Sequence, residues 1–329
     1  MQTDLLPTSS GAELKKAVTR AVELLGKDQI VALPTETVYG LAADALNPTA
    51  VVKIFEAKER PRFDPLIVHL PERQWLEKIA NVEVGDRQLI LQLADTFWPG
   101  PFTLVLPKRE FVPDIVTAGL DTVAVRVSAH PVFSDIIRAF GKPLAAPSAN
   151  RFGQVSPTTA QHVLDELEER IPLIVDAGQT EHGLESTIIT VQEGRIQILR
   201  RGPITAEVLS EFTDVGTVAP TQKISSPGQL PSHYAPKTPL EIIDTGQKYS
   251  LKRHERVGLL AWSPIESHQK FAAVRRLSQK QDPREAAANL FRYLHELDTL
   301  GLDCIIAERV PSRGLGAAIM DRLERASHR

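Results

Sequence analysis

Hydroxyl groups gather where a short apolar run near the N-terminus ends. In residues 33–41, Thr35 and Thr37 follow the apolar stretch that closes on Leu33. Strand ends and the loops after them commonly hold ligands, and a pair of hydroxyls can hydrogen-bond to one. Threonine and serine also satisfy backbone groups within ordinary turns. Taken alone, this segment leaves a ligand site and a capped turn equally open.

Cations gather in residues 58–69. Lys58, Arg60 and Arg62 lie in or beside a loop bounded by prolines, which restrict the backbone and so pre-order the charged side chains. Arginine offers a planar fork to phosphate oxygens, and lysine offers a compact charge. The loop therefore suits a triphosphate, although a run of charges is also typical of plain solvated surface.

Two later segments carry small polar side chains beside apolar runs. Ser148 and Asn150 follow the apolar run 144–146, where they could hold a phosphate or a ribose. Ser156 lies close behind them, and a helix cap is the structural alternative for its hydroxyl. Ser186 enters another apolar run, and Arg200 ends the run after it.

Alternating strands and helices must position these segments. Apolar residues three or four apart predict helices over 11–26, 47–55, 87–97, 131–140 and 158–169. Short apolar runs predict strands over 30–33, 66–70, 102–106, 123–127, 144–146, 173–175, 186–191 and 195–199. This order indicates an α/β fold with a twisted sheet.

The texture of the sequence changes after residue 202. The stretch 202–239 is rich in proline and has little periodicity, which is typical of a domain linker. Beyond it, the patterns predict strands over 241–243, 257–261 and 304–307, and helices over 284–300 and 315–326. We therefore expect a second, smaller α/β domain.

The composition limits the classes of function. The formal net charge is −3, which does not favour a protein whose main role is to neutralise nucleic-acid phosphates. Cys304 is the sole cysteine, so one chain can form neither an intramolecular disulfide nor a thiolate metal cluster. No apolar stretch reaches the roughly 20 residues needed to span a bilayer, and the N-terminus lacks a signal-peptide pattern. We expect a cytoplasmic protein that does not associate with membranes.

The polar segments resemble a known family when they are taken together. In order and approximate spacing they match the YrdC-like domain of the threonylcarbamoyl-AMP synthases, through residues 34–40, 58–69, 147–150 and 185–188. Residues 226–228 and 233–236 resemble the linker of the two-domain members of that family. The resemblance covers nearly the whole chain from about Gly11, and it is weakest in the C-terminal domain.

The resemblance implies an architecture. Residues 1–205 are expected to form a catalytic domain with a YrdC-like twisted mixed sheet and helices. Residues 206–239 are expected to form a linker that is also an active-site lid. A smaller Rossmann-like α/β domain is expected over 240–329.

It also implies an activity, that of a nucleotidyltransferase in tRNA processing. Such an enzyme makes L-threonylcarbamoyl-AMP and pyrophosphate from L-threonine, bicarbonate or CO2, and ATP. Downstream proteins then transfer the threonylcarbamoyl group to an adenosine of tRNA, which gives N6-threonylcarbamoyladenosine.

The resemblance further assigns roles by position. The residues that match the threonine site are Thr37, His69, Arg126, Ala146 and Ser186. Those that match the ATP site are Lys58, Arg60, Asp64, Thr122, Ser148, Asn150, Ser156, Arg200 and Tyr234. Lys58 and Arg60 are assigned to catalysis, and Tyr234 is assigned to closure over ATP.

Asp64 departs from the family pattern, which commonly has Asn at this position. A carboxylate repels a triphosphate unless a cation lies between them, and magnesium bound to ATP would supply that cation. The sequence contains no dedicated set of metal ligands. Because Mg2+ often keeps several waters, we expect it to arrive with ATP rather than in a protein cage.

Two other functions stay open. A YrdC-like module could bind RNA or associate with ribosomes without this catalysis, using Lys58, Arg60, Arg62 and Arg126 to contact phosphates, but aromatics are not interleaved with these cations. A related enzyme could make a carbamoyl-adenylate from another donor, although such proteins carry acylphosphatase-like or zinc-finger segments. Neither a phosphate loop, a dinucleotide fingerprint nor a zinc motif is present in the sequence. Direct binding of tRNA by this chain also stays open.

Overall fold

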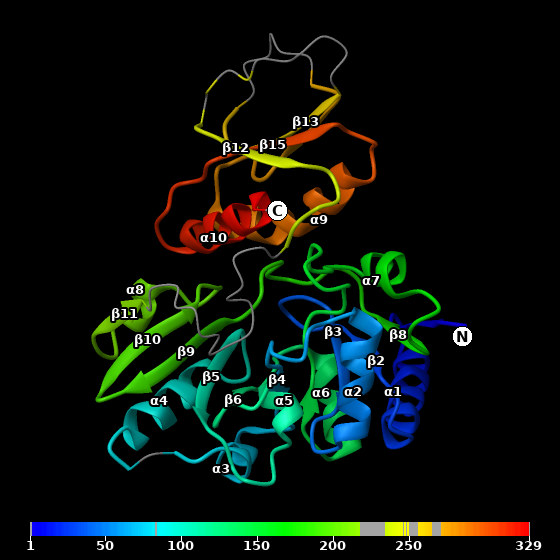
Figure 1. Cartoon of the computed structure of the whole chain (residues 1–329), viewed down its shortest axis with the longest axis vertical. Coiled ribbons are helices and arrows are strands. Elements are labelled where there is room, and N and C mark those ends of the chain that lie inside the picture. Colours follow the sequence, from blue (N-terminus) through cyan, green and yellow to red (C-terminus); the bar gives the residue numbers. More distant parts are fainter. Residues whose placement is uncertain are drawn as a thin grey trace.

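The chain forms two α/β bodies, each built on its own sheet (Figure 1). The computed structural model describes residues 2–82, 84–217, 234–245, 247, 249, 256–264 and 271–328. Helices α9 (Pro283–Asp298) and α10 (Leu315–Ser327) lie between the smaller sheet and the larger body (Figure 1). The predicted α/β class with two domains agrees with this arrangement.

The larger sheet mixes parallel and antiparallel pairs. Its strands, in spatial order, are β1 (Asp4–Pro7), β8 (Leu173–Asp176), β2 (Val31–Leu33), β3 (Gly40–Asp44), β7 (Leu144–Ala145), β4 (Ile67–His69), β6 (Thr122–Arg126), β5 (Phe102–Pro107), β9 (Thr187–Gln192), β10 (Arg195–Arg200) and β11 (Val215–Thr217). Neighbours far apart in sequence, such as β4 and β6, pair in parallel. Such pairing brings side chains from distant segments to one edge.

Helices cover both faces of this sheet, and β2 shows why. Val31 and Leu33 pack into a cluster with α1 (Gly11–Gly26) and α6 (Pro131–Phe140). Ala32, between them, packs into the opposite cluster. Successive side chains on a strand point to opposite faces, so an entirely apolar strand is buried on both sides.

The face of the sheet on which Ala32 lies is covered by three longer helices and several short ones. The long ones are α2 (Pro48–Lys58), α4 (Arg87–Phe97) and α7 (Ala160–Leu167), whose apolar residues share one cluster. The remaining short helices of the larger body are η1 (Arg73–Trp75), α3 (Leu76–Ile79), α5 (Asp114–Thr117) and α8 (Ala206–Leu209).

The ends of α2 follow from its flanking residues. Asn47 caps its N-terminus by accepting a hydrogen bond from the amide of Thr49, and Pro48 occupies the first turn. Glu59 ends the helix in the left-handed region, at φ 54°. This ending turns the chain directly into the cation-rich loop that begins at Arg60.

The smaller sheet is parallel throughout. Its order is β12 (Leu240–Ile243), β15 (Cys304–Glu308), β13 (Val257–Ala261) and β14 (Ala273–Arg276). Asp282 caps α9, and Pro283 begins it. A parallel sheet in which α9 connects β14 to β15 agrees with the α/β domain that was expected.

The linker is shorter than the expected range 206–239. Helix α8 and strand β11 fall inside that range, and β11 pairs with β10, so the first sheet extends to Thr217. The expected motif at 226–228 and His233 lie outside the described residues. Among the helices that the structure describes, none is long and apolar enough to cross a bilayer.

Candidate active site

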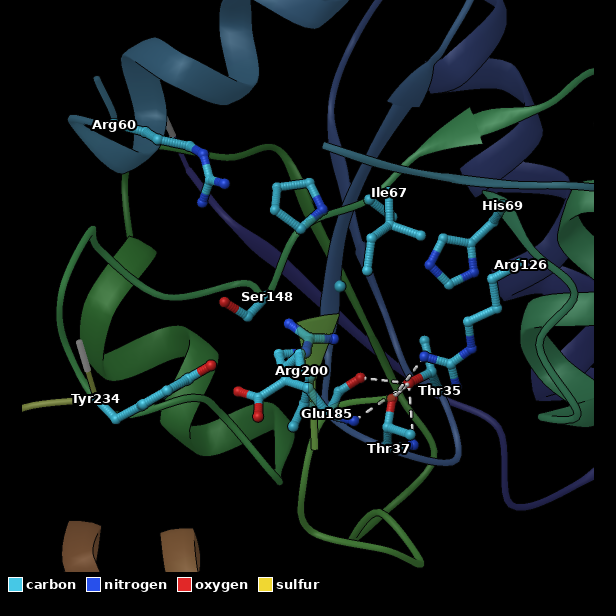
Figure 2. A pocket seen from close by; sticks show the side chains of 14 residues that line it. Thr35, Thr37, Arg60, Ile67, His69, Arg126, Ser148, Glu185, Arg200 and Tyr234 are labelled. Atoms are coloured by element: carbon cyan, nitrogen blue, oxygen red, sulfur yellow. Dashed lines mark hydrogen bonds between the residues drawn. The ribbon is translucent and has the colours of Figure 1, made fainter. Parts of the chain in front are cut away.

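A pocket lies where strands in the middle of the larger sheet end, and Tyr234 of the linker is among its lining residues. It is lined by Thr35, Thr37, Val38, Gly40, Arg60, Ile67, His69, Arg126, Ala146, Pro147, Ser148, Glu185, Arg200 and Tyr234. Figure 2 shows His69, Arg126 and Thr37 on one side and Arg60, Ser148 and Tyr234 on the other. Arg200 and Glu185 lie between these two ends (Figure 2). The first end holds residues predicted for threonine, and the second holds residues predicted for ATP.

At the first end, strand pairing places His69 beside Arg126. The two residues are register partners at the ends of the parallel strands β4 and β6. Arg126 is buried, and its guanidinium donates to Thr37 Oγ1 at 3.1 Å and to the Gly100 carbonyl at 3.1 Å. Its Nη2 also contacts Glu36 Oε1 at 2.6 Å. Arg126, which the resemblance assigned to the threonine site, is therefore already paired with a carboxylate of the protein.

Glu36 stays ionised in this buried position. Burial alone would raise its pKa, but the Arg126 charge and a hydrogen bond from Ser128 lower the pKa from 4.5 to about 2. The folded pKa lies below the unfolded value. The stability that this shift contributes is therefore complete above about pH 4.5 and is lost as the pH falls towards 2.

Replacing Glu36 with glutamine is expected to destabilise the protein by about 3 kcal/mol at pH 7, because each pH unit of the shift corresponds to about 1.4 kcal/mol. Urea unfolding of both proteins at several pH values measures this difference. It should shrink below pH 4.5 and vanish near pH 2. Equal stabilities at pH 7 would show that the pair contributes nothing.

His69 provides a neutral polar group at the same end. Burial and the Arg126 charge lower its pKa to about 3, so the ring is uncharged at neutral pH. Its Nδ1 is buried and has no hydrogen-bond partner among the described residues. The ring also packs against Phe133 at 4.8 Å between centroids. A neutral ring nitrogen held in place beside a pocket suits recognition of a substrate hydroxyl or amine.

At the second end, Arg60 is fixed by its own loop. Its Nη2 contacts Asp64 Oδ2 at 2.8 Å and donates to the Pro65 carbonyl at 2.9 Å. Burial raises the pKa of Asp64, whereas the charges of Arg60, Lys58 and Arg200 oppose that rise. Arg60 thus already compensates the charge of Asp64 within the protein.

Lys58 and Asn150 do not line the pocket, but they contact the loop that does. Lys58 Nζ donates to the Ser148 carbonyl at 2.6 Å and also to the Asn150 carbonyl. Burial and the Arg60 charge lower the pKa of Lys58 well below its ordinary value. Asn150 donates to the Arg151 and Gln154 carbonyls, and its buried Oδ1 has no partner within the described parts of the chain. Lys58 therefore holds the loop that presents Ser148.

Arg200 lies at the centre of the pocket. It donates to the Ser186 carbonyl at 3.1 Å and to Ser186 Oγ at 3.0 Å, and that hydroxyl also contacts Thr103 Oγ1 at 2.7 Å. Ser186 is thus buried beneath Arg200 and does not line the pocket. Within the described residues, Arg200 forms no salt bridge with a carboxylate, so its charge is available to an anion.

Ser156 and Thr122 do not line the pocket. Ser156 Oγ donates to Glu185 Oε1 at 2.5 Å, and Thr159, rather than Ser156, caps α7. Thr122 begins β6, at the opposite end of that strand from Arg126. Its predicted role at ATP gains no support from the pocket.

Glu36 and Glu185 were not assigned roles from the sequence. Both stand within segments that were singled out, next to Thr37 and Ser186. The signal in the sequence was an acid next to a hydroxyl residue. The arginine partner of Glu36 lies 90 residues away and that of Glu185 lies 137 residues away, so spacing could not reveal either pair.

No group of three or more His, Cys, Asp or Glu that could hold a metal occurs in the described residues.

Two family models together match most of the chain. One, described as "Telomere recombination", matches residues 23–202. The other, described as "Threonylcarbamoyl-AMP synthase, C-terminal domain", matches residues 204–328.

Individual relatives match over nearly their whole length. The chain is 38% identical to the threonylcarbamoyl-AMP synthase of Pyrococcus abyssi, over 93% of each chain. It is 39% identical to that of Bacillus subtilis, over 94% of this chain and 92% of the relative. The crystal structure of P. abyssi Sua5 complexed with L-threonine superposes with a TM-score of 0.86 and 35% identity, covering 99% of this chain and 98% of that one.

Proposed function

The chain belongs to the threonylcarbamoyl-AMP synthase family, and we propose that it joins L-threonine, bicarbonate and ATP into threonylcarbamoyl-AMP with release of pyrophosphate. The threonine amine adds to bicarbonate-derived CO2 and loses a proton, which gives a carbamate. A carbamate oxygen then attacks the α-phosphate, and the bond from that phosphorus to the bridging oxygen of pyrophosphate breaks. The reaction needs no covalent enzyme intermediate.

The observation that best supports this proposal is the two-ended pocket. Threonine occupies the end with His69, Arg126 and Thr37. His69 is neutral there and the Arg126 charge is balanced by Glu36, so this end carries little net charge, which suits an amino acid. Its carboxylate shares the Arg126 guanidinium with Glu36. The end with Arg60, Ser148 and Arg200 takes the phosphates, because Arg200 brings a charge that forms no salt bridge within the described residues and Arg60 brings a pre-positioned fork.

Binding RNA without catalysis is a weaker explanation of the same residues. Lys58, Arg60 and Arg126 are 1%, 8% and 3% exposed, so a polymer on the surface cannot reach their charged groups. Only Arg62, of the cations assigned to that role, is exposed. A small, deeply inserted anion such as a nucleotide triphosphate fits buried cations better.

The proposal also covers the magnesium ion that accompanies ATP and the use of the product after its release. We infer that Mg2+ enters with ATP and is held mainly by phosphate oxygens and water, since Asp64 is engaged by Arg60 and Glu185 by Ser156. When bound, the ion offsets phosphate charge, while Arg60 and Arg200 orient the phosphates. We expect the product to pass in the cytoplasm to proteins that transfer the threonylcarbamoyl group to tRNA.

The fate of isotopically labelled bicarbonate tests the proposed chemistry. Label is expected in a nucleotide product, detected by mass spectrometry, only when threonine and ATP are both present. Incorporation of label without threonine would point to a carbamoyl-adenylate made from another donor. A product that lacks the label would overturn the proposed role of bicarbonate.

A further inference from the structure

The C-terminal domain contributes a buried arginine to the back of the pocket. Arg322 lies on α10, and its side chain is 0% exposed. Its Nε donates to Glu185 Oε2 at 2.9 Å, and its Nη2 donates to the Arg201 carbonyl at 2.8 Å. Nη1 contacts the neighbouring Asp321. One guanidinium of the smaller domain thus joins two adjoining loops of the larger one.

Glu185 is the group that gives this contact a function. Its carboxylate lines the pocket between the threonine and nucleotide ends (Figure 2). Burial would raise its pKa, but the charges of Arg322 and Arg200 lower it, so the carboxylate stays ionised. An ionised acid at this point repels a triphosphate unless its charge is compensated. Arg200 faces the pocket, so Arg322 is the compensating charge on the other side.

Tyr234 extends the same network to the linker. The Arg322 guanidinium carbon lies 5.1 Å from the centre of the Tyr234 ring, within the range of a cation–π contact. The ring also stacks on Phe291 of α9, at 5.5 Å between centroids. Tyr234 is held in the left-handed region, at φ 66°, where a tyrosine persists only if its surroundings fix it. The smaller domain supplies part of these surroundings through Arg322 and Phe291, and Val38, Val155 and Leu184 of the larger body belong to the same buried cluster.

We propose that Arg322 is a positioning residue through which the C-terminal domain prepares the nucleotide end of the pocket. It compensates Glu185, orients that carboxylate towards Ser156, and supports Tyr234 at the rim. This inference rests on the proposed function, because it assumes that the pocket binds ATP. The competing explanation is that Arg322 only fastens the two domains together.

The two explanations predict opposite effects on ATP affinity when the Glu185 charge is removed. If Arg322 compensates Glu185, Arg322→Met leaves a buried anion in the pocket, and ATP affinity should fall by about 100-fold. Removing that anion as well, in Glu185→Gln/Arg322→Met, should restore most of the affinity. Glu185→Gln alone should not weaken ATP binding. A fastening role predicts instead that each change weakens binding and that the double variant is the poorest.

The experiment is titration calorimetry of Mg-ATP into the full chain, with thermal unfolding of every variant alongside. Glu207→Ala is the matched control for domain contacts, because Glu207 accepts a hydrogen bond from the Gly314 amide at the start of α10 and does not line the pocket. That control should bind ATP as the wild type does. If Arg322→Met fails to fold, Arg322→Lys takes its place, because it keeps the charge but cannot make all three contacts of the guanidinium. Its ATP affinity should stay close to that of the wild type if the charge compensates Glu185, and it should fall if the contacts only fasten the domains.

The outcomes separate this inference from the proposed function. A wild-type chain that does not bind ATP would overturn both. A wild-type chain that binds ATP, together with a double variant no better than Arg322→Met, would overturn the role of Arg322 alone. Restored affinity in the double variant, with Glu185→Gln at least as tight as the wild type, is the result that supports it.

Discussion

Replacing Arg60 with alanine is expected to lower turnover by about 100-fold or more, which is the scale of effect when one preorganised electrostatic group is lost. Its guanidinium is fixed by Asp64 and the Pro65 carbonyl before substrate arrives, so little reorganisation is needed as charge shifts to pyrophosphate. Arg60→Lys should recover part of the rate, because it restores the charge without the fork. Steady-state rates at saturating ATP and threonine measure the effect.

Two controls separate catalysis from electrostatic damage. Arg60→Ala leaves Asp64 buried without its ion pair, so Arg60→Ala/Asp64→Asn tests how much of the loss comes from that carboxylate. Arg62→Ala removes an exposed cation of the same loop and should leave the rate unchanged. Full activity of Arg60→Ala, or an equal loss in Arg62→Ala, would contradict the role given to Arg60.

Discrimination between threonine and valine is expected to be the other large effect. Valine has nearly the same shape as threonine but lacks the hydroxyl, so the buried Nδ1 of His69 would stay without a partner. Sites built to hydrogen-bond a substrate hydroxyl reject the analogue by roughly 10⁴-fold. We therefore expect kcat/KM for valine to be lower than that for threonine by about this factor.

His69→Leu is expected to reduce this preference, because it removes the nitrogen that reads the hydroxyl while keeping an apolar contact with Phe133. Arg60→Ala serves as the comparison, since it should slow both amino acids equally and leave their ratio unchanged. Comparable kcat/KM values for threonine and valine in the wild type would refute recognition of the hydroxyl at this end.

Much of the fold was predictable because it depends on local periodicity. The helices over 11–26, 87–97 and 131–140 were predicted with the bounds of α1, α4 and α6, since each carries a regular apolar stripe. Strand β3 was missed, because Gly40–Asp44 contains no β-branched residue and becomes a strand by pairing with β2 and β7. Strands β1, β11 and β14 were missed too, and β1 and β11 are edges of the larger sheet.

The site residues also fall into those that the local sequence identifies and those that depend on the fold. Residue type and local sequence identified Thr37, Arg60 and Ser148, which line the pocket. They did not reveal the buried pairs that set the charge of the site, because each long-range pair depends on the fold rather than on spacing. Arg126 with Glu36 and Arg322 with Glu185 are the pairs that only the structure could supply.

Pyrophosphate release by the wild-type chain, measured with ATP, threonine and bicarbonate omitted in turn, tests the central claim most directly. The proposed reaction couples loss of pyrophosphate to attack by a carbamate that contains both other substrates. Release should therefore require all three, and each omission should reduce it to background. Release at the full rate without threonine would contradict the account and would favour a carbamoyl-adenylate synthase or a simple hydrolase.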